Sequence, residues 1–571
     1  MKGGAGCASW NSRPCQLALW SAIAAAALAA RVLGLRYGLP AVYNPDEVAI
    51  MSRALAFAKG DLNPHNFLYP TFYFYVLFAW EGLTALVAVT TRAVESFGAF
   101  QREFFLDPTR VFVAGRLLTA LLGTATAIGT GLLGSRIAGR FVGLFAAALL
   151  AVAPLHVLNS HYVKHDVPVT LVIVLAYLAY ERLWSGRTAS VIPAAVLTGV
   201  AFSTHYYTIF LAVPLAWSVV RRARTPRDAA VKLASAGLIA AAAFLLLSPF
   251  FLFELETALR DIRANRQIVV DRAAVDLGYA ASTARYLKLL LLDSVGMPTA
   301  ILGGAGLFIG LRTRLKQTLW LAAFPVPFLL FIFTTYPASR YLVPVTPFIA
   351  ILAGMAIDGL RGARGGRVLA AAAVGMAVVT AGAESLRIDL FIRQTDTRTL
   401  ALNYIQSHVP DGSTILTQPY SVPLEPTADV LREAVRRSGR EMPTKTKLQI
   451  ERQPYPRPAY RLIYLGRGLD ADKLYMPYPE LTGAGALAPV HAERVAFVIF
   501  KRYNESDPAA EPFLTALARE GQRIAVFSPY RDASSAAPSE AFLHNTDARI
   551  DASLERPGPV VEIWQLDGPR S

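Results

Sequence analysis

Apolar runs long enough to cross a lipid bilayer recur along the chain up to residue 386 and then stop. A membrane-spanning helix needs about 20 apolar residues, because the bilayer offers no partner for exposed backbone polar groups. Only 17% of the residues are charged, against about 25% in soluble proteins. We therefore predict a polytopic α-helical membrane protein with eleven spans, near residues 16–36, 111–135, 139–157, 167–183, 189–204, 206–221, 231–253, 297–311, 317–336, 340–360 and 367–386.

Positive charge is concentrated in short turns between these runs, at 136–140, 182–187, 221–232, 312–316 and 361–367. Basic turns stay on the cytoplasmic side of a membrane. All of these turns lie on the cytoplasmic side if the N-terminus is cytoplasmic and the further apolar run 68–92 does not cross the membrane. That run is rich in aromatic residues, which suits the membrane interface. We expect it to lie along or dip into the outer leaflet, with an ordinary span as the alternative. The net charge of +15 then reflects topology, and we expect no nucleic-acid partner.

The segment 387–571 has a different pattern, in which strand-like runs alternate with helix-like stretches. DTRTLALNYIQSHVPDGSTILTQ indicates an amphipathic helix, a Pro-Asp-Gly turn and a β-strand. Further strand-like runs are YRLIYLG, RVAFVIFKRY, QRIAVFSP and PVVEIWQL. We predict a membrane domain over 1–386 and a small soluble α/β domain over 387–571, which lies outside the cytoplasm after eleven spans.

The predicted outer face contains few polar residues, and their types suit transfer of a group from a phosphate. The first outer loop contains the adjacent carboxylates of YNPDE, and the later outer turns read LNSHYVKHD, STHYY and TTYPASRY. A carboxylate near a membrane surface can act as a general base. Lys, Arg and His side chains can hold a phosphate and stabilise charge on a leaving group. Together these features predict group transfer from a lipid phosphate.

Several of these residues also have simpler interpretations. Asn44-Pro45-Asp46 is a helix-start signal, so Asp46 and Glu47 can belong to a capped first helical turn. Arg340 can pair with a lipid headgroup, and His205 can be a satisfied interfacial histidine.

A metal site is a further alternative at the LNSHYVKHD turn. His161 and His165 are four residues apart and would share one face of a helix. With Asp166 they are candidate ligands of a divalent cation, although we favour a solvated loop.

The order of these motifs resembles that of the GT-C glycosyltransferases of the protein O-mannosyltransferase and aminoarabinose-transferase type. The likeness covers roughly 16 to 386. YNPDE is similar to the first loop of these enzymes, and HNFLYPTFYFYV to their Pro-containing aromatic motif. The paired spans around the Gly-Arg turn, the His-Tyr centre of LTGVAFSTHYYTIFLAVPL and the Arg-Tyr-x-x-Pro of ASRYLVPVTPFIAILAG are also similar.

The resemblance implies a polyprenyl-phosphate-linked sugar as donor and a catalytic base in the first loop. That base falls on Asp46, with Asp166 as its partner carboxylate and Glu47 in support. The candidates for binding the donor and its phosphate are His165, Lys164, Arg340, Tyr69, His205, Tyr206 and His65. The last of these is proposed because NFLYP stands where a lysine often precedes the aromatic motif.

We therefore expect a glycosyltransferase of a bacterial cytoplasmic (inner) membrane, acting on a lipid, glycan or protein acceptor at the extracytoplasmic face. A ligase that uses a lipid-linked oligosaccharide is an alternative within enzymes. A flippase or transporter of lipid-linked sugars fits less well, because transporters place ionisable groups at mid-membrane. A non-catalytic assembly protein is a third alternative. The sugar, the acceptor, metal dependence, the role of 387–571 and the oligomeric state stay open.

Overall fold

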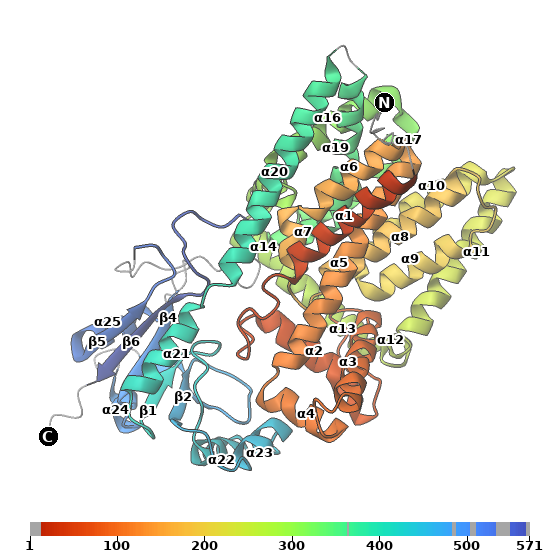
Figure 1. The fold of residues 1–571 in the computed structure, drawn as a ribbon. Coiled ribbons are helices and arrows are strands. Elements are labelled where there is room, and N and C mark those ends of the chain that lie inside the picture. The colour runs from red at the N-terminus through yellow and green to blue at the C-terminus, as the bar shows by residue number, and fades with distance from the viewer. Residues whose placement is uncertain (1–12, 363–364, 482–486, 503–509, 533–548, 567–571) are drawn as a thin grey trace.

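The computed structural model describes residues 13–362, 365–481, 487–502, 510–532 and 549–566. It contains a long helical bundle with an α/β unit at one end (Figure 1). The α-helices of the bundle are α1 (Arg13–Val32), α2 (Pro45–Ala56), α3 (Phe72–Thr90), α4 (Phe97–Leu106), α5 (Thr109–Ala138), α6 (Arg140–Ala151), α7 (Pro154–Asn159), α8 (Asp166–Trp184), α9 (Ile192–Thr204), α10 (Ala212–Arg222), α11 (Pro226–Leu247), α12 (Phe250–Phe253), α13 (Leu255–Arg266), α14 (Arg272–Asp276), α15 (Tyr279–Leu289), α16 (Met297–Thr313), α17 (Leu315–Ala322), α18 (Pro325–Ile332), α19 (Thr346–Arg361) and α20 (Gly366–Ile392). Short 3₁₀ or π-helical segments are η1 (Phe57–Lys59), η2 (Tyr206–Leu211), η3 (Gln267–Asp271), η4 (Leu290–Ser294) and η5 (Ser339–Val345).

Helices are present at every one of the predicted membrane runs. Among the described residues, eight helices are long and apolar enough to cross a membrane, or up to nine if a bent pair, Tyr279–Ser294 with Met297–Thr313, is one span. Helices α6 and α9 are shorter, with 12 and 13 residues. The multi-pass membrane class is confirmed, whereas the number of crossings stays a prediction.

Helix α3 occupies the run on which the predicted topology depends. Its length and composition also qualify it as a span. It lies with α2 and α4 at the end of the bundle that carries the α/β unit (Figure 1). Trp80 of α3 donates from Nε1 to the carbonyl oxygen of Ala114 near the start of α5, at 2.8 Å. With 30 residues, α5 is about 45 Å long and exceeds a hydrocarbon core of about 30 Å. An interfacial α3 against a protruding end of α5 is consistent with these contacts, and its location stays a prediction.

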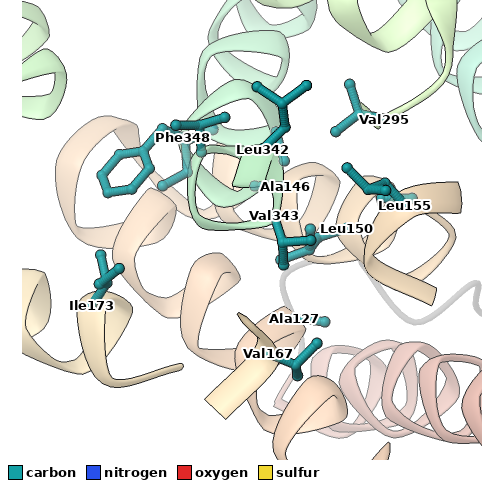
Figure 2. Packing of buried hydrophobic residues seen from close by; sticks show 14 of the residues in the cluster. Ala127, Ala146, Leu150, Leu155, Val167, Ile173, Val295, Leu342, Val343 and Phe348 are labelled. Atoms are coloured by element: carbon teal, nitrogen blue, oxygen red, sulfur yellow. The ribbon is translucent and has the colours of Figure 1, made fainter. Parts of the chain in front are cut away.

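The bundle is held together by small residues at helix crossings and by apolar side chains between them. Lipid removes the hydrophobic drive for helix association, so close backbone approach matters more than in water. At Gly306, where α16 meets α19, a β-carbon would lie 1.8 Å from the carbonyl oxygen of Leu352. Figure 2 shows Leu150, Val167 and Phe348, from three different helices, packed in the buried core.

The α/β unit contains a six-stranded sheet in the order β3-β2-β1-β4-β6-β5. Strands β1 (Thr414–Thr417), β2 (Arg461–Leu465), β3 (Leu474–Met476) and β4 (Phe497–Arg502) are parallel, whereas β6 (Val560–Leu566) runs antiparallel to β4 and to β5 (Gly521–Phe527). The helices are α21 (Thr397–His408), α22 (Ala428–Ser438), α23 (Thr444–Ile450), α24 (Ala488–Ala492), α25 (Glu511–Glu520) and η6 (Tyr478–Glu480). Every predicted strand is present. Only β3, with three residues, was too short to be predicted.

Polar contacts connect the α/β unit to the first loop of the bundle. Tyr43 and Thr399 share a hydrogen bond of 2.7 Å between their hydroxyl groups. The guanidinium of Arg398 lies 3.8 Å from the centre of the Tyr43 ring. Arg398 is itself buried and paired with Asp396 at 2.8 Å, and Asp396 accepts a hydrogen bond from Tyr37 at 3.4 Å. We call these five interacting residues the tether: Tyr37, Tyr43, Asp396, Arg398 and Thr399.

Candidate active site

Helix α2 begins at the signal that the sequence predicts. Asn44 is the N-cap and accepts a hydrogen bond from the backbone nitrogen of Asp46 at 3.1 Å, and Pro45 occupies the first turn. Acidic side chains in a first turn are also favoured by the helix dipole. The capping interpretation is therefore correct for the backbone. It leaves open what each carboxylate contacts.

The Glu47 carboxylate is completely buried and fully engaged. Arg116 of α5 donates to its two oxygens at 2.9 and 2.8 Å, and the backbone nitrogen of Val163 donates to it at 3.0 Å. Arg116 also donates to the carbonyl oxygens of Leu35 and Tyr37, both at 2.7 Å. Glu47 therefore connects three segments of the chain and has no free oxygen to offer a substrate. These contacts are those of a positioning residue, and the supporting catalytic role that we expected of Glu47 stays a prediction.

The turn 158–166 is not the solvated loop that we favoured, because all of its residues are buried. Helix α7 ends at Asn159, and irregular backbone then leads to Asp166, the first residue of α8. The first loop covers this turn through the bond from Val163 to Glu47. Charged and histidine side chains of the turn are thus held in fixed positions inside the protein.

Asp46 is the accessible member of the carboxylate pair and lies between two cations. Lys164 approaches its Oδ2 at 3.1 Å, and Arg340 of η5 pairs with the same oxygen. The Asp46 side chain is 39% exposed, whereas that of Lys164 is 6% exposed. Asp166 is buried, and its charge interacts with Arg340, Lys164 and Asp46. The structure therefore brings together four of the predicted site residues, two carboxylates and two cations.

The cations control the protonation of Asp46. Burial alone would raise the pKa of Asp46, but the nearby charges of Lys164 and Arg340 outweigh it and lower the pKa to about 2. Burial, together with the charge of Arg340, lowers the pKa of Lys164 below the usual lysine value, although Asp46 and Asp166 oppose the shift. At neutral pH the Asp46 side chain is a carboxylate. It becomes a stronger base only if its counter-charges move away.

An aromatic wall adjoins this charged cluster. His165 stacks on Tyr69 with ring centres 4.3 Å apart, and His205 stacks on Tyr207 at 3.8 Å. Tyr69 also meets His205 edge-on at 5.3 Å. Burial lowers the pKa of His165 well below its usual value and that of His205 to about 3. Both rings are neutral at physiological pH, so the structure favours a wall over the cationic phosphate contact expected of His165.

Two further predicted residues lie apart from the charged cluster. The Tyr206 hydroxyl donates to the carbonyl oxygen of Phe67 at 3.0 Å, which fixes the first loop. His65 is exposed and lies between Asp61 and Glu254, at 2.8 Å from each. An imidazole held by two carboxylates is poorly placed to bind a phosphate. The structure does not bring His65 to the site.

The candidate metal ligands do not converge. His161 and His165 lie in irregular backbone and share no helical face. The ring nitrogens of His161 lie 2.9 Å from the Val157 carbonyl oxygen and 2.6 Å from that of Leu33, whereas His165 belongs to the aromatic wall. Within the described ranges, no group of three or more His, Cys, Asp or Glu side chains is arranged to hold a metal ion.

Arg116 is the important residue that the sequence prediction missed. It lies in the apolar run 111–135 and is the partner of Glu47. A lone charge within a membrane run is rare and marks a structural or functional partner elsewhere. That signal was present, but the sequence gives no direct indication of which acid Arg116 pairs with.

Comparison with known proteins agrees with this architecture. Residues 108–253 match the family described as dolichyl-phosphate-mannose-protein mannosyltransferase. The structure is similar to that of ArnT from Cupriavidus metallidurans bound to undecaprenyl phosphate, with 14% identity, a TM-score of 0.50, and coverage of 97% of this chain and 98% of that one. It is also similar to the oligosaccharyltransferase of Archaeoglobus fulgidus, with 12% identity, a TM-score of 0.49, and coverage of 86% and 70%. No curated protein sequence matches the chain significantly.

The fold shared with ArnT along almost the whole chain defines a GT-C membrane protein. The family match covers the turn that carries Lys164 and Asp166. The chain therefore has the GT-C membrane fold that it shares with ArnT, and its segment 108–253 is similar to the protein mannosyltransferase family. The predicted fold class and the resemblance noted in the motif order are confirmed.

Proposed function

We propose that the chain transfers a sugar from a polyprenyl-phosphate-linked donor to an acceptor hydroxyl or amine, with Asp46 as the general base. One observation carries the proposal: an accessible carboxylate is paired with two cations, Lys164 and Arg340, that can bind a phosphate instead. The undecaprenyl phosphate bound to the structurally similar ArnT supports a lipid phosphate as the ligand.

The chemistry follows from this pairing. The acceptor oxygen or nitrogen attacks the anomeric carbon while its proton passes to Asp46. The bond between that carbon and the phosphate oxygen breaks, and polyprenyl phosphate leaves with the bonding electrons. Lys164 and Arg340 stabilise the negative charge that develops on the leaving phosphate. Attack from the side opposite the phosphate inverts the anomeric centre.

Donor binding would also activate the base. Without donor, Lys164 and Arg340 neutralise Asp46 and hold its pKa at about 2. A donor phosphate competes with Asp46 for the same two cations, since charge-assisted pairs with phosphate are strong. Once the cations turn to the phosphate, the pKa of Asp46 rises towards its usual range. Asp166 would then keep the two cations near the phosphate.

The surroundings suit a lipid donor and a membrane location. Helix α3 exposes Leu83, Leu86 and Val87, which can border a prenyl chain and membrane lipids. The positive-inside rule places the Asp46 end of the bundle and the α/β unit outside the cytoplasm. We propose a bacterial cytoplasmic membrane as the site of action.

The test is release of polyprenyl phosphate by the purified full-length protein supplied with a panel of polyprenyl-phosphate sugars and acceptors. We expect Asp46→Asn to lower the rate at least ~100-fold, within the range of general-base contributions. Asp61→Asn is the matched control, because Asp61 is an exposed acid of the same loop paired with His65. Equal rates for wild type and Asp46→Asn would refute the assigned role. Turnover only with lipid-diphosphate oligosaccharides would favour the ligase alternative.

A further inference from the structure

A charged cavity lies at the end of the bundle opposite Asp46. It has a volume of about 350 Å³ and lies between the ends of α5, α8, α10 and α17. Helix α8 connects the two regions, because it begins at Asp166 and ends at Trp184, with 19 residues. At about 1.5 Å per residue, the ends of α8 are about 27 Å apart. The cavity is therefore separate from the candidate active site.

Buried indole rings and exposed arginines form this cavity. Trp184 and Trp320 are buried, and Arg136, Arg221 and Arg222 contribute three guanidinium groups to the lining. Ser185 and Gln317 add polar groups. The lining thus combines two indole rings with several cationic donors.

Glu181 is the acidic residue of the cavity lining, and two arginines neutralise its charge. Glu181 is buried and lies 3.2 Å from Arg187 and 3.8 Å from Arg136. Arg221 stacks over the Trp184 ring at 4.2 Å, which holds its planar group without neutralising it. In the part of the chain that the structure describes, neither Arg221 nor Arg222 pairs with a carboxylate. Within the described residues, these two cations of the cavity therefore have no carboxylate partner.

Arg222 lies close to the turn after α8. Gly186 has a φ of +81°, and a β-carbon there would lie 3.1 Å from the guanidinium of Arg222. The guanidinium thus lies against the turn that borders the cavity. An arginine that borders a cavity can bind a phosphate group, because its planar guanidinium donates two parallel hydrogen bonds to phosphate oxygens.

We propose that this cavity is a binding site for a phosphate group, either the headgroup of an anionic phospholipid or a soluble phosphate. Arg221 and Arg222 donate to the phosphate oxygens, and Arg136 and Gln317 complete the rim. Basic pockets between membrane helices on the cytoplasmic side suit anionic headgroups, and the positive-inside rule places this end there. The site does not depend on the role of Asp46.

The experiment compares two double variants that remove the same charge from the same basic segment, 221–232. Arg221→Gln with Arg222→Gln removes the unpaired cations of the cavity. Arg224→Gln with Arg227→Gln is the control, since neither residue lines the cavity. Purified full-length protein is titrated with phosphatidylglycerol, phosphatidic acid or phosphatidylcholine, and bound lipid is counted by native mass spectrometry. A parallel arm measures the melting temperature in inorganic phosphate and in sodium chloride of equal ionic strength.

We expect the wild type and the control to prefer anionic lipid over phosphatidylcholine, and the cavity variant to lose at least ~10-fold in anionic-lipid binding. If inorganic phosphate alone raises the melting temperature, and only when Arg221 and Arg222 are present, the ligand is a soluble phosphate. The proposal is refuted if the wild type shows no anion preference, if both double variants lose binding equally, or if chloride reproduces the phosphate effect.

Discussion

Asp46 and Glu47 are neighbours in sequence, yet their carboxylates occupy opposite kinds of environment. Glu47 is 0% exposed and its partner Arg116 is 1% exposed, with a pair distance of 2.8 Å. Asp46 is 39% exposed and is paired with Lys164 and Arg340 at the edge of the site. The buried pair fixes the geometry, whereas the accessible one can exchange partners. Under the proposed mechanism, this acidic dipeptide combines a structural residue with the general base.

The two pairs should respond differently to loss of one member. Removing one partner of a buried ion pair leaves an uncompensated charge in a low dielectric and is strongly destabilising. A partly exposed pair is screened by water and contributes little to stability. The predictions that follow test this contrast, beginning with the largest effect.

The largest effect is expected on stability, from Glu47→Gln. The substitution leaves Arg116 buried without a carboxylate, and we expect a loss of about 3–5 kcal/mol. The measurement is retention of monodisperse protein on heating in detergent, with Asp46→Asn as the matched control. A double variant, Glu47→Met with Arg116→Met, should recover the part of the loss that comes from the unpaired charge. A Glu47→Gln protein as stable as Asp46→Asn would contradict the proposed contrast.

The next effect is on turnover, from Arg340→Gln. Removing a charged donor from a developing phosphate charge costs about 100-fold or more in rate. We expect this loss with a melting temperature close to that of the wild type, because Arg340 and Asp46 are both partly exposed. Arg361→Gln, at the far end of α19, is the control. Loss of folded protein in Arg340→Gln would instead assign Arg340 a structural role.

A smaller effect concerns the dependence of kcat/KM on pH. The pKa of Asp46 is about 2 in the free enzyme, so the carboxylate stays ionised and contributes no acid limb above pH 4. Lys164 has a pKa lowered by burial, so rising pH should remove its charge and weaken donor binding before an ordinary lysine would titrate. Lys164→Arg should shift that alkaline limb upward, because arginine stays protonated. An unchanged alkaline limb in Lys164→Arg would exclude Lys164 as its source.

The smallest effect is expected from Tyr43→Phe in the tether. It removes the hydrogen bond of 2.7 Å to Thr399 and keeps the ring beneath Arg398. A hydrogen bond of this kind contributes about 0.5–1.5 kcal/mol, so turnover should change only a few-fold. Tyr455→Phe, within the α/β unit, is the control variant. If both variants behave identically in the transferase assay, the tether does not influence the site.

Local patterns accounted for most of the architecture. The membrane runs, the helix start at Asn44 and the strands of the α/β unit follow from composition, periodicity and turn residues, which act over a few positions. The resemblance in motif order placed Asp46, Asp166, Lys164 and Arg340 in one site, and the structure brings them together.

Long-range pairing was the part that the sequence could not provide. Glu47 and Arg116 are separated by 69 residues, and local sequence does not distinguish Arg116 from Lys164 as the partner of Glu47. The turn 158–166 looked solvated because its residues are polar, yet the first loop and the aromatic wall cover it. His65 was misplaced for a related reason, since Glu254, 189 residues away, holds it elsewhere.

The tether also sets the order in which the molecule can be completed. Tyr43 and Thr399 are 356 residues apart, so the first loop is made long before its anchor. At synthesis rates of about 5–20 residues per second, that interval is about 20 to 70 seconds. During this time a nascent chain already inserted in the bilayer would hold Asp46 on a loop that has its contacts with Arg116 and Val163 but still lacks the tether. The first loop would then gain its contacts with the α/β unit only after the start of α21 has emerged, so the tether forms late in synthesis.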